Sequence, residues 1–572
     1  MAKQGEPLRV DARVAAGVLV LLTVIAFGPG FGGGFIWDDD AHVTDSRPVV
    51  DPGGLRAIWL EPGSVPQYYP LTHSSFWLEY RFWGDNPLGY HAVNILLHAV
   101  SVLVLWRVLV GLGLPGAWLA AAFFAVHPVH AESVVWISER KNTLSGLFAL
   151  ASTWAWLGWW RAERGSVTGT GTGTGTGRWW LALLLFAAAL LSKTVTVTVP
   201  AAWLVICWWQ GGRIGRREWL GVLPMLLLTV PMGLMTVWTE QQHIGAGRLD
   251  LGLTVPDRLQ VAGRALWFYA GKLAWPSDLA FIYPRWSIDS ASFTGWLYPL
   301  GAMAVIGLLW WGRGRIGRGP LAAVLLFAGT LAPALGFVDV YPMQFSFVAD
   351  HFQYLASIPL LSGAAWLIVT RWYASHGIAL VLVLVLVLVG VSFVHSRVFL
   401  DTSILWSDTV KKNPRSPLAL TSLGNVLGEA GSHELAERRH RQAIEVDPRF
   451  PDAWVNLAVE LQSQGRKDEA FEAAGRAVEL APWLPRARVN LALGLAERER
   501  YDEAVEQLEA AVDSDSRFSM AWAQLARIEL IRNNAAGLKR AVEGLRPLDR
   551  GLAERFAREF EQTRPHNDVP SP

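Results

Sequence analysis

Three consecutive carboxylates, Asp38, Asp39 and Asp40, follow the first long apolar stretch of the chain. Adjacent acids repel one another and raise each other's pKa unless a neighbouring group compensates for their charge. A bound cation, a basic side chain or a proton-transfer role would each provide that compensation. The run therefore predicts a site for chemistry close to a membrane surface, and the structural alternative is a solvated acidic turn.

A second polar cluster has the sequence His127–Glu132. Two histidines three residues apart, followed by a glutamate, can bind a divalent metal when the acidic run supplies a further ligand. Contact with a phosphate or hydroxyl group of a substrate is the other interpretation of His127 and His130. Glu132 either positions a substrate hydroxyl or shares a proton with the acidic run, or it holds His130 or Arg140 in a structural pair.

Basic residues accompany these clusters at three places in the chain. Arg140 and Lys141 follow the histidine cluster, Lys193 begins a later helix, and His351 lies in the polar segment Asp350–Ser357. Arginine binds a phosphate through two parallel N–H groups, and lysine binds it as a point charge. These side chains are therefore candidates for binding a phosphate, and the alternative is contact with lipid headgroups or helix ends.

Aromatic residues are frequent, with 30 tryptophans in the chain. Most of them are expected in the belts that membrane proteins place at the two bilayer surfaces. Trp37 lies beside the acidic run, and the segment Phe281–Trp286 is also rich in aromatic rings. We predict that Trp37 stacks on a sugar or prenyl group of a substrate.

The composition divides the chain into two regions of different class. Of the 572 residues, 52% are hydrophobic and only 17% charged, where a soluble protein would carry about 25% charged residues. Residues 1–400 are predicted to form a membrane domain, residues 401–560 a water-soluble helical domain, and residues 561–572 a disordered tail. The net charge of +1 says nothing about nucleic acid, but the sequence has no basic stripe, so no nucleic-acid partner is predicted. The single Cys207 excludes a disulfide framework within the chain.

Apolar stretches of membrane length predict eleven spans. Their centres lie near residues 20, 100, 120, 150, 185, 202, 228, 303, 328, 362 and 385. Lys3, Arg9 and Arg13 precede the first stretch, which is predicted to be a retained anchor with the N-terminus in the cytoplasm of a bacterial cell. The acidic run, the histidine cluster and the His351 segment then fall on the outer side of the inner membrane, as does the soluble region.

The soluble region contains an internal repeat. Pro414, Pro448 and Pro482 are spaced 34 residues apart, and leucines and alanines recur at fixed offsets between them. This period is typical of the tetratricopeptide repeat, in which helix–turn–helix units stack on one another. Such a solenoid presents a concave face, which we expect to bind an extended segment of another protein.

These motifs and the repeats together resemble the transmembrane and tetratricopeptide-repeat O-mannosyltransferases, over nearly the whole chain. More broadly they are similar to protein O-mannosyltransferases with the C-type glycosyltransferase fold. Asp38-Asp39 matches the acidic motif that this family carries in its first external loop. His127–Glu132 looks like the family's His-Pro-Ile-His-Thr-Glu, which is the most specific match, and Arg140 matches an arginine shortly downstream.

Two further motifs depart from the family pattern. Ser192-Lys193 matches the family's Ser-Lys-Glu, but Thr194 replaces the glutamate. Asp350–Ser357 matches Glu-Arg-Tyr-Leu-Tyr-Leu-Pro-Ser loosely, with His351 where the arginine would be. These two departures weaken any transfer of donor specificity from the family.

The resemblance implies an all-α fold, with a polytopic membrane domain of about eleven spans followed by the repeat solenoid. It also implies transfer of a sugar, mannose or similar, from a polyprenyl-phosphate donor to a hydroxyl of an exported protein. Such a reaction needs a base for the hydroxyl, a positive group for the departing phosphate and a pocket that excludes water. Asp39, ahead of Asp38, is the predicted base, and Glu132 assists it. No cofactor follows with certainty, and a divalent metal is the minor interpretation of the histidines.

Two other functions compete with sugar transfer. The first is a non-catalytic membrane scaffold whose repeats assemble an envelope complex, and the second is a transporter. Eleven spans exceed what an anchor needs, and transporters usually place acids near the bilayer midplane, where this sequence has few. Both observations favour the enzyme.

Overall fold

The computed structural model describes residues 11–165, 174–239, 251–371 and 377–563. Within these ranges the chain forms helices and no strand, as predicted. It divides into two compact units, Met1–Asp408 and Thr409–Pro572, and the division falls inside α18 (Thr402–Lys412). Most of the predicted tail, residues 564–572, lies outside the described residues.

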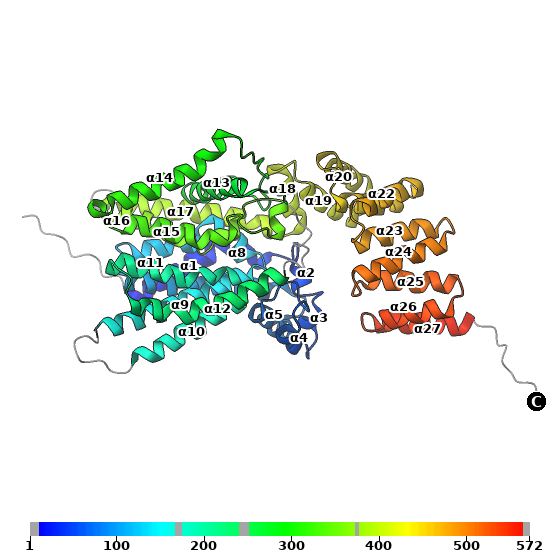
Figure 1. Cartoon of the computed structure of the whole chain (residues 1–572), viewed down its shortest axis with the longest axis horizontal. Helices are drawn as coiled ribbons and strands as arrows, with labels where there is room; N and C mark the ends of the chain where they lie inside the picture. The colour runs from blue at the N-terminus through cyan, green and yellow to red at the C-terminus, as the bar shows by residue number, and fades with distance from the viewer. Residues whose placement is uncertain (1–10, 166–173, 240–250, 372–376, 564–572) are drawn as a thin grey trace, which may run out of the picture. The chain divides into compact units, whose positions relative to one another are not determined.

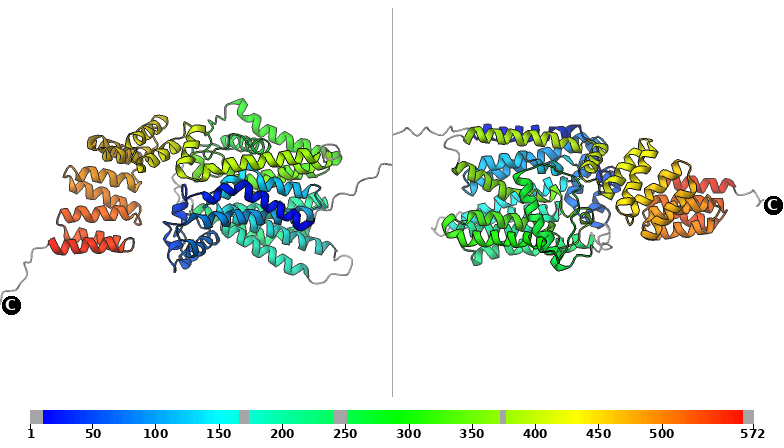
Figure 2. Two further views of the ribbon diagram at one scale, coloured as in Figure 1. Left: turned by 180° about the vertical axis from the view of Figure 1, so that it is seen from behind. Right: turned by 90° about the horizontal axis from the view of Figure 1, so that it is seen from above.

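Long helices build the first unit and run side by side in Figures 1 and 2. Each of the eleven predicted span centres falls within a helix. By length and composition, six described segments can cross a membrane, or seven if a bent helix pair counts as one span. The helices that contain the predicted centres are α1 (Ala12–Phe27), α6 (Pro87–Gly111), α7 (Ala117–Val126), α9 (Arg140–Gly165), α10 (Thr174–Ser192), α11 (Val199–Gly211), α12 (Arg216–Thr239), α14 (Phe293–Ile316), α15 (Gly319–Leu331), α16 (Ser357–Arg371) and α17 (Gly377–Ser396).

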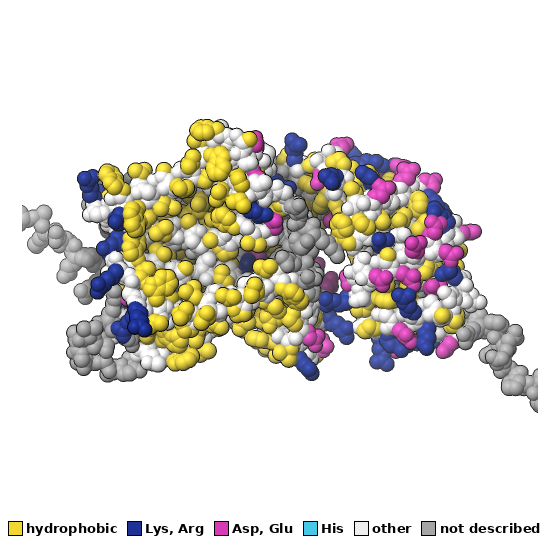
Figure 3. Space-filling model, viewed as in Figure 1, with side chains coloured by type: hydrophobic (Ala, Val, Ile, Leu, Met, Phe, Trp, Pro, Cys, Tyr) yellow, Lys and Arg dark blue, Asp and Glu magenta, His cyan; other side chains and the backbone are white. Residues whose placement is uncertain are grey.

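The surface of this unit is apolar over wide areas, as Figure 3 shows in yellow. Helix α14 has no buried residue at all, and its outward side chains include Leu308 and Trp311. Exposed apolar patches of this extent are unfavourable in water but are what a lipid-facing surface requires. The first unit is therefore a membrane domain.

A break between two helices places the histidine cluster, which is buried, inside the bundle. Helix α7 ends at Val126, and the chain bends by 54° before the short helices η2 (Pro128–His130) and α8 (Ala131–Val135). Pro128 lacks a backbone N–H and cannot continue the preceding helix. Polar side chains can therefore lie at this point among otherwise apolar helices.

Four short helices gather at one end of the first unit in Figure 1. Their small apolar core contains Val43, Val49, Ile58 and Phe76, and Ile137 joins it from the connection between α8 and α9. This shared core fixes the acidic run against that connection. The four helices are α2 (Asp39–His42), α3 (Arg47–Val50), α4 (Leu55–Leu60) and α5 (Pro70–Trp83).

The second unit consists of stacked helix pairs, shown from yellow to red in Figures 1 and 2. The Trp454 indole donates to the carbonyl of Pro448 (3.0 Å), and Trp522 donates likewise to Ser516 (2.9 Å). The fourth repeat therefore keeps this contact although serine replaces proline. The helices are α19 (Pro417–Glu429), α20 (His433–Val446), α21 (Pro451–Ser463), α22 (Lys467–Leu480), α23 (Pro485–Ala496), α24 (Tyr501–Ser514), α25 (Ser519–Ile531), α26 (Ala535–Leu545) and α27 (Arg550–Thr563).

Candidate functional site

Asp39 is completely buried, and backbone donors occupy both of its carboxylate oxygens. Oδ2 accepts from the Ile36 N–H (2.9 Å), and Oδ1 accepts from the Ser138 N–H (2.7 Å). Trp37, between these residues, has a positive φ of 52°, which is uncommon for a residue other than glycine. Asp39 therefore stabilises a tight turn and ties it to the connection before α9.

Asp38 lies beside Asp39 but in a different environment. Its side chain is 32% exposed, and its carboxylate accepts from the Ser138 hydroxyl (2.7 Å) and lies 3.4 Å from His42 Nε2. Burial favours the neutral form, but His42, Lys141 and Ser138 outweigh it and hold the pKa of Asp38 below its ordinary value. Asp38 is therefore the charged, accessible member of the pair.

The other two carboxyls of the acidic run, Asp39 and Asp40, have different surroundings from Asp38. Burial, and then the charge of Asp38, raise the pKa of Asp39 well above its ordinary value. The rise in pKa expected of adjacent acids thus occurs at Asp39, whereas basic neighbours lower the pKa of Asp38. Asp40 faces outward and accepts a hydrogen bond from the Thr44 hydroxyl (3.0 Å).

A cluster of three charged side chains lies at the start of α9, near Asp38. Glu139 Oε1 is 3.1 Å from Lys141 Nζ, and its Oε2 is 3.2 Å from Lys193 Nζ. Although burial opposes its charge, the two lysines hold the pKa of Glu139 far below its ordinary value. Two ammonium groups share one carboxylate, so this Lys141–Glu139–Lys193 cluster carries one surplus positive charge.

Arg140 points away from this cluster into the interior. Its guanidinium pairs with both oxygens of Glu79 and also donates to Asn94, Ser75 and the Tyr90 carbonyl. All five N–H groups of an arginine are then engaged. In this arrangement Arg140 has no donor left for a phosphate, and it joins α5, α6 and α9 instead.

Glu132 is held by the backbone and the ring of one residue. Its Oε2 accepts from the His351 N–H (2.9 Å), and its Oε1 lies 2.8 Å from His351 Nδ1. Asn142 donates to the His351 carbonyl (3.0 Å) and thereby fixes the same residue from α9. The structural partner of Glu132 is thus His351, rather than His130 or Arg140 as the sequence suggested.

His127 and His130 are buried in the break between α7 and α8. His130 Nδ1 lies 2.9 Å from the Phe124 carbonyl and its Nε2 lies 3.0 Å from the Ser357 hydroxyl. His127 Nε2 lies 3.1 Å from the Leu273 carbonyl. His130 thus satisfies a carbonyl at the end of α7, and His127 one in the last turn of α13 (Val255–Ala274). Within the described ranges no three His, Cys, Asp or Glu side chains are grouped to hold a metal ion.

Aromatic rings surround the exposed side of the acidic turn. The Trp37 ring centroid is 4.9 Å from Trp406 and 6.2 Å from Phe281, and Trp136 lies 5.2 Å from Phe281. Trp136 also lies 5.6 Å from Lys141 Nζ and 6.1 Å from the His351 ring. Trp37 keeps about a third of its surface exposed, so its ring remains available for a sugar or prenyl contact.

Sequence inspection missed several residues of this site. The sequence alone assigns no role to Glu79, Ser138 or Glu139. One signal pointed to them, since buried arginines and lysines require nearby carboxylates. Glu139 stands directly beside Arg140 and Lys141 in the sequence, whereas the location of Glu79 on another helix can be recognised only in the fold.

The fold and the site together define a polytopic helical membrane protein that carries tetratricopeptide repeats. The Tetratricopeptide repeat family matches residues 451–482. Among curated proteins, the chain is similar to TMTC-type protein O-mannosyl-transferases, as its motifs predicted. It is 33% identical over 151 residues to "Protein O-mannosyl-transferase F38B6.6" of Caenorhabditis elegans, which is 24% of this chain and 22% of that protein.

Two further relatives are TMTC4 proteins, each named "Protein O-mannosyl-transferase TMTC4". The mouse protein is 30% identical over 209 residues, 32% of this chain and 28% of the relative. The human protein is 31% identical over 205 residues, 31% of this chain and 27% of the relative. The chain therefore matches less than a third of the length of these relatives.

Solved structures of repeat proteins are also similar to part of the chain. "Crystal structure of YrrB: a TPR protein with an unusual peptide-binding site" covers 27% of this chain and 82% of its own at 18% identity, with a TM-score of 0.24. "Crystal structure of MamA" covers 28% of this chain and 90% of its own at 17% identity, with a TM-score of 0.22.

Proposed function

We propose that this protein transfers a sugar, mannose or similar, from a polyprenyl-phosphate donor to a hydroxyl of an exported protein. The observation that carries the proposal is an accessible, charged carboxylate next to a surplus positive charge. Asp38 supplies the first, and the Lys141–Glu139–Lys193 cluster supplies the second. The similarity to protein O-mannosyl-transferases supports the same reaction.

In this reaction the base must accept the proton of the acceptor hydroxyl while its oxygen attacks the anomeric carbon of the sugar. We assign the base to Asp38 rather than Asp39, because two backbone N–H groups already occupy Asp39. The lowered pKa of Asp38 makes it a weak base but keeps it ionised at neutral pH.

The bond between the sugar and the phosphate breaks as the new bond forms, and its electron pair moves to a phosphate oxygen. Lys141 and Lys193 stabilise the negative charge that develops there, since together they exceed the charge of Glu139 by one. Their ammonium groups are largely buried, which strengthens this electrostatic effect. Arg140 has no part in this step, and we assign it to holding the site together.

The remaining residues shape the site. Glu132 fixes His351 at its edge, and Trp37 and Trp136 provide flat surfaces for the sugar or the prenyl chain. His127 and His130 maintain the helix break. We assign binding of the acceptor protein to the concave face of the repeats, on the outer side of a bacterial inner membrane with the N-terminus in the cytoplasm.

The direct test is sugar transfer by the purified full-length protein in lipid, with a panel of labelled polyprenyl-phosphate sugars and acceptor proteins from its own envelope. Asp38→Asn should lower transfer by about 10²- to 10⁴-fold, as loss of a general base does. The protein should still fold, with a modest loss of thermal stability because the charge that faces His42 is removed. Asp40 is two residues further along the chain and exposed, so Asp40→Asn should leave transfer unchanged. Absence of transfer from every donor would favour the non-catalytic scaffold.

A further inference from the structure

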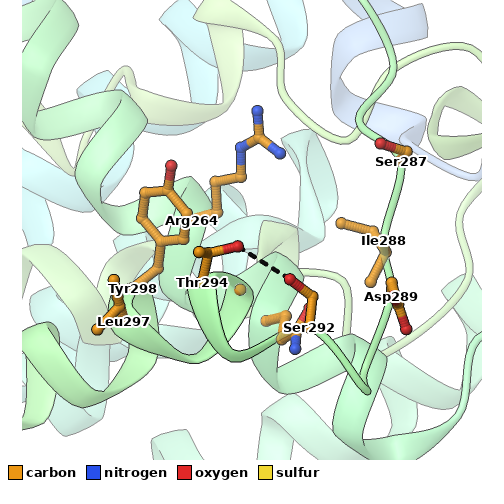
Figure 4. A pocket seen from close by; sticks show the side chains of 10 residues that line it. Arg264, Ser287, Ile288, Asp289, Ser292, Thr294, Leu297 and Tyr298 are labelled. Carbon is orange, nitrogen blue, oxygen red and sulfur yellow. Dashed lines mark hydrogen bonds between the residues drawn. The ribbon is translucent and has the colours of Figure 1, made fainter.

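A pocket of about 550 Å³ lies apart from the Asp38 site, between α13 (Val255–Ala274) and the start of α14. Figure 4 shows it between the first turn of α14 and the segment that precedes this helix. A volume of this size suits a small ligand or a lipid headgroup. Its polar lining consists of Gln260, Arg264, Ser287, Asp289, Ser292 and Thr294.

Arg264 is the cation of this pocket. Its guanidinium lies over the ring of Trp286, 4.4 Å from the centroid, and 5.7 Å from that of Tyr298. Within the described part of the chain, neither a hydrogen bond nor a salt bridge to Arg264 is formed. The two ring contacts hold the guanidinium in place but use none of its N–H groups, which remain available for an anion.

A second donor in the pocket lacks an acceptor. Gln260 is only 3% exposed, and its amide nitrogen makes no hydrogen bond. A buried amide without a partner is costly unless a ligand supplies one. The start of α14 lies opposite, where Ser292 and Thr294 share a hydrogen bond (2.9 Å; dashed in Figure 4) and the first N–H groups of the 24-residue helix favour negative charge.

Asp289, the single acid in the lining, is engaged elsewhere. Its carboxylate accepts from the Ala291 N–H (2.9 Å), and in Figure 4 it lies at the far side of the pocket from Arg264. The donors of Arg264, Gln260 and the helix start therefore share the pocket with one carboxylate, and neither Arg264 nor Gln260 pairs with it among the described contacts. An oxyanion with several acceptor oxygens, such as a phosphate, satisfies all of them.

The surroundings indicate where the phosphate comes from. Helix α14 can span a membrane and has no buried residue, and Leu297, a lining residue, is more than half exposed. Phe293 and Leu300 extend this apolar surface along the same helix. Acyl chains attached to a phosphate in the pocket would lie along this surface, whereas a free phosphate would gain nothing from it.

We propose that this pocket binds the phosphate headgroup of a membrane glycerophospholipid. Arg264 and Gln260 hold the phosphate oxygens, the start of α14 adds backbone donors, and the acyl chains follow the exposed face of α14. The site is separate from the residues proposed for sugar transfer, so its test does not depend on that activity.

Native mass spectrometry of the full-length protein in detergent can measure retention of dioleoyl phosphatidylglycerol. Dioleoylglycerol, which has the same chains without the phosphate, serves as the comparison ligand. Arg264→Gln should weaken retention of the phospholipid by about tenfold or more, the usual effect of losing a charge-assisted hydrogen bond. Gly295→Leu should do the same by filling the pocket, because a side chain there displaces the Gln260 amide.

Arg313→Gln provides the matched control. Arg313 also stacks on a tryptophan, Trp310, but near the other end of α14 and outside the pocket. It should change retention by less than about twofold, and thermal unfolding scans identify any variant that fails to fold.

Wild-type retention by both pocket variants would overturn the proposal, as would equal retention of dioleoylglycerol. Binding of inorganic phosphate that Arg264→Gln abolishes, without preferential retention of the phospholipid, would assign the pocket to a free anion instead. If Arg264→Gln does not fold, the retention of phospholipid by Gly295→Leu and the comparison with dioleoylglycerol still test the proposal.

Discussion

In the membrane unit, most ion pairs between described residues lie in the interior, whereas in the repeat unit most lie on the surface. The side chains of Arg140 and Glu79 are 0% and 9% exposed, and those of Arg540 and Glu509 are 55% and 41% exposed. The two pairs have similar chemistry but different surroundings. A buried charge that loses its partner remains in a medium of low polarity, while an exposed one is solvated by water. The same substitution should therefore have very different effects in the two units.

The largest effect is expected for Glu79→Leu, which leaves the Arg140 guanidinium without its carboxylate. Breaking a buried pair from one side costs about 3–5 kcal/mol of the free energy of unfolding. Denaturant unfolding of the full-length protein in detergent would measure it. The control is Glu61→Gln, since Glu61 is an exposed acid that directly follows α4, in the same group of short helices, and should change stability by less than about 0.5 kcal/mol. A loss below about 1 kcal/mol for Glu79→Leu would contradict the closed network inferred for Arg140.

Glu139→Gln should lower the free energy of unfolding somewhat less at neutral pH, by about 3 kcal/mol. Without the carboxylate, the positive charges of Lys141 and Lys193 repel each other, but both side chains retain some access to solvent. This cost should depend on pH. The folded pKa of Glu139 lies below its ordinary value of 4.5, so its stabilising contribution is fully present above pH 4.5 and is lost as the pH falls toward the folded pKa.

Unfolding of the wild type and Glu139→Gln at pH 7 and pH 3.5 tests this sign. The difference between the two proteins should shrink at the lower pH, since the unfolded state then binds the additional proton. Asp40→Asn removes an exposed acid from the same end of the unit and should show no comparable change. A difference that grows on acidification would show that Glu139 is not stabilised by the two lysines.

The buried network also marks the limit of sequence inspection. Helix positions followed from apolar stretches of membrane length, and the repeats followed from a period of 34 residues, because both patterns are local. The different environments of Asp38 and Asp39 do not follow from local sequence, since they depend on the position of the Ser138 backbone, which is 99 residues from Asp39 in the chain. The engagement of Arg140 with Glu79 likewise depends on how α5 and α9 meet.

In the repeat unit, we expect an intermediate effect from Trp454→Phe. This change removes the hydrogen bond from the indole to the Pro448 carbonyl and keeps most of the ring contact. The net loss should be about 1 kcal/mol, the usual contribution of one hydrogen bond. Trp522→Phe is the matched variant in the fourth repeat and should lose a similar amount. Unequal losses would show that the fourth repeat is held by other contacts.

The smallest effect is expected for Arg540→Gln, which breaks the surface pair with Glu509. Exposed pairs contribute about 0.2–1 kcal/mol, and added salt screens them. The difference from wild type should therefore be below about 1 kcal/mol in dilute buffer and should disappear in about 1 M salt. The cost of Glu79→Leu should persist in the same salt, because the Arg140 pair is shielded from ions. Equal salt dependence for the two variants would contradict the contrast between the units, since it would place both pairs in contact with solvent.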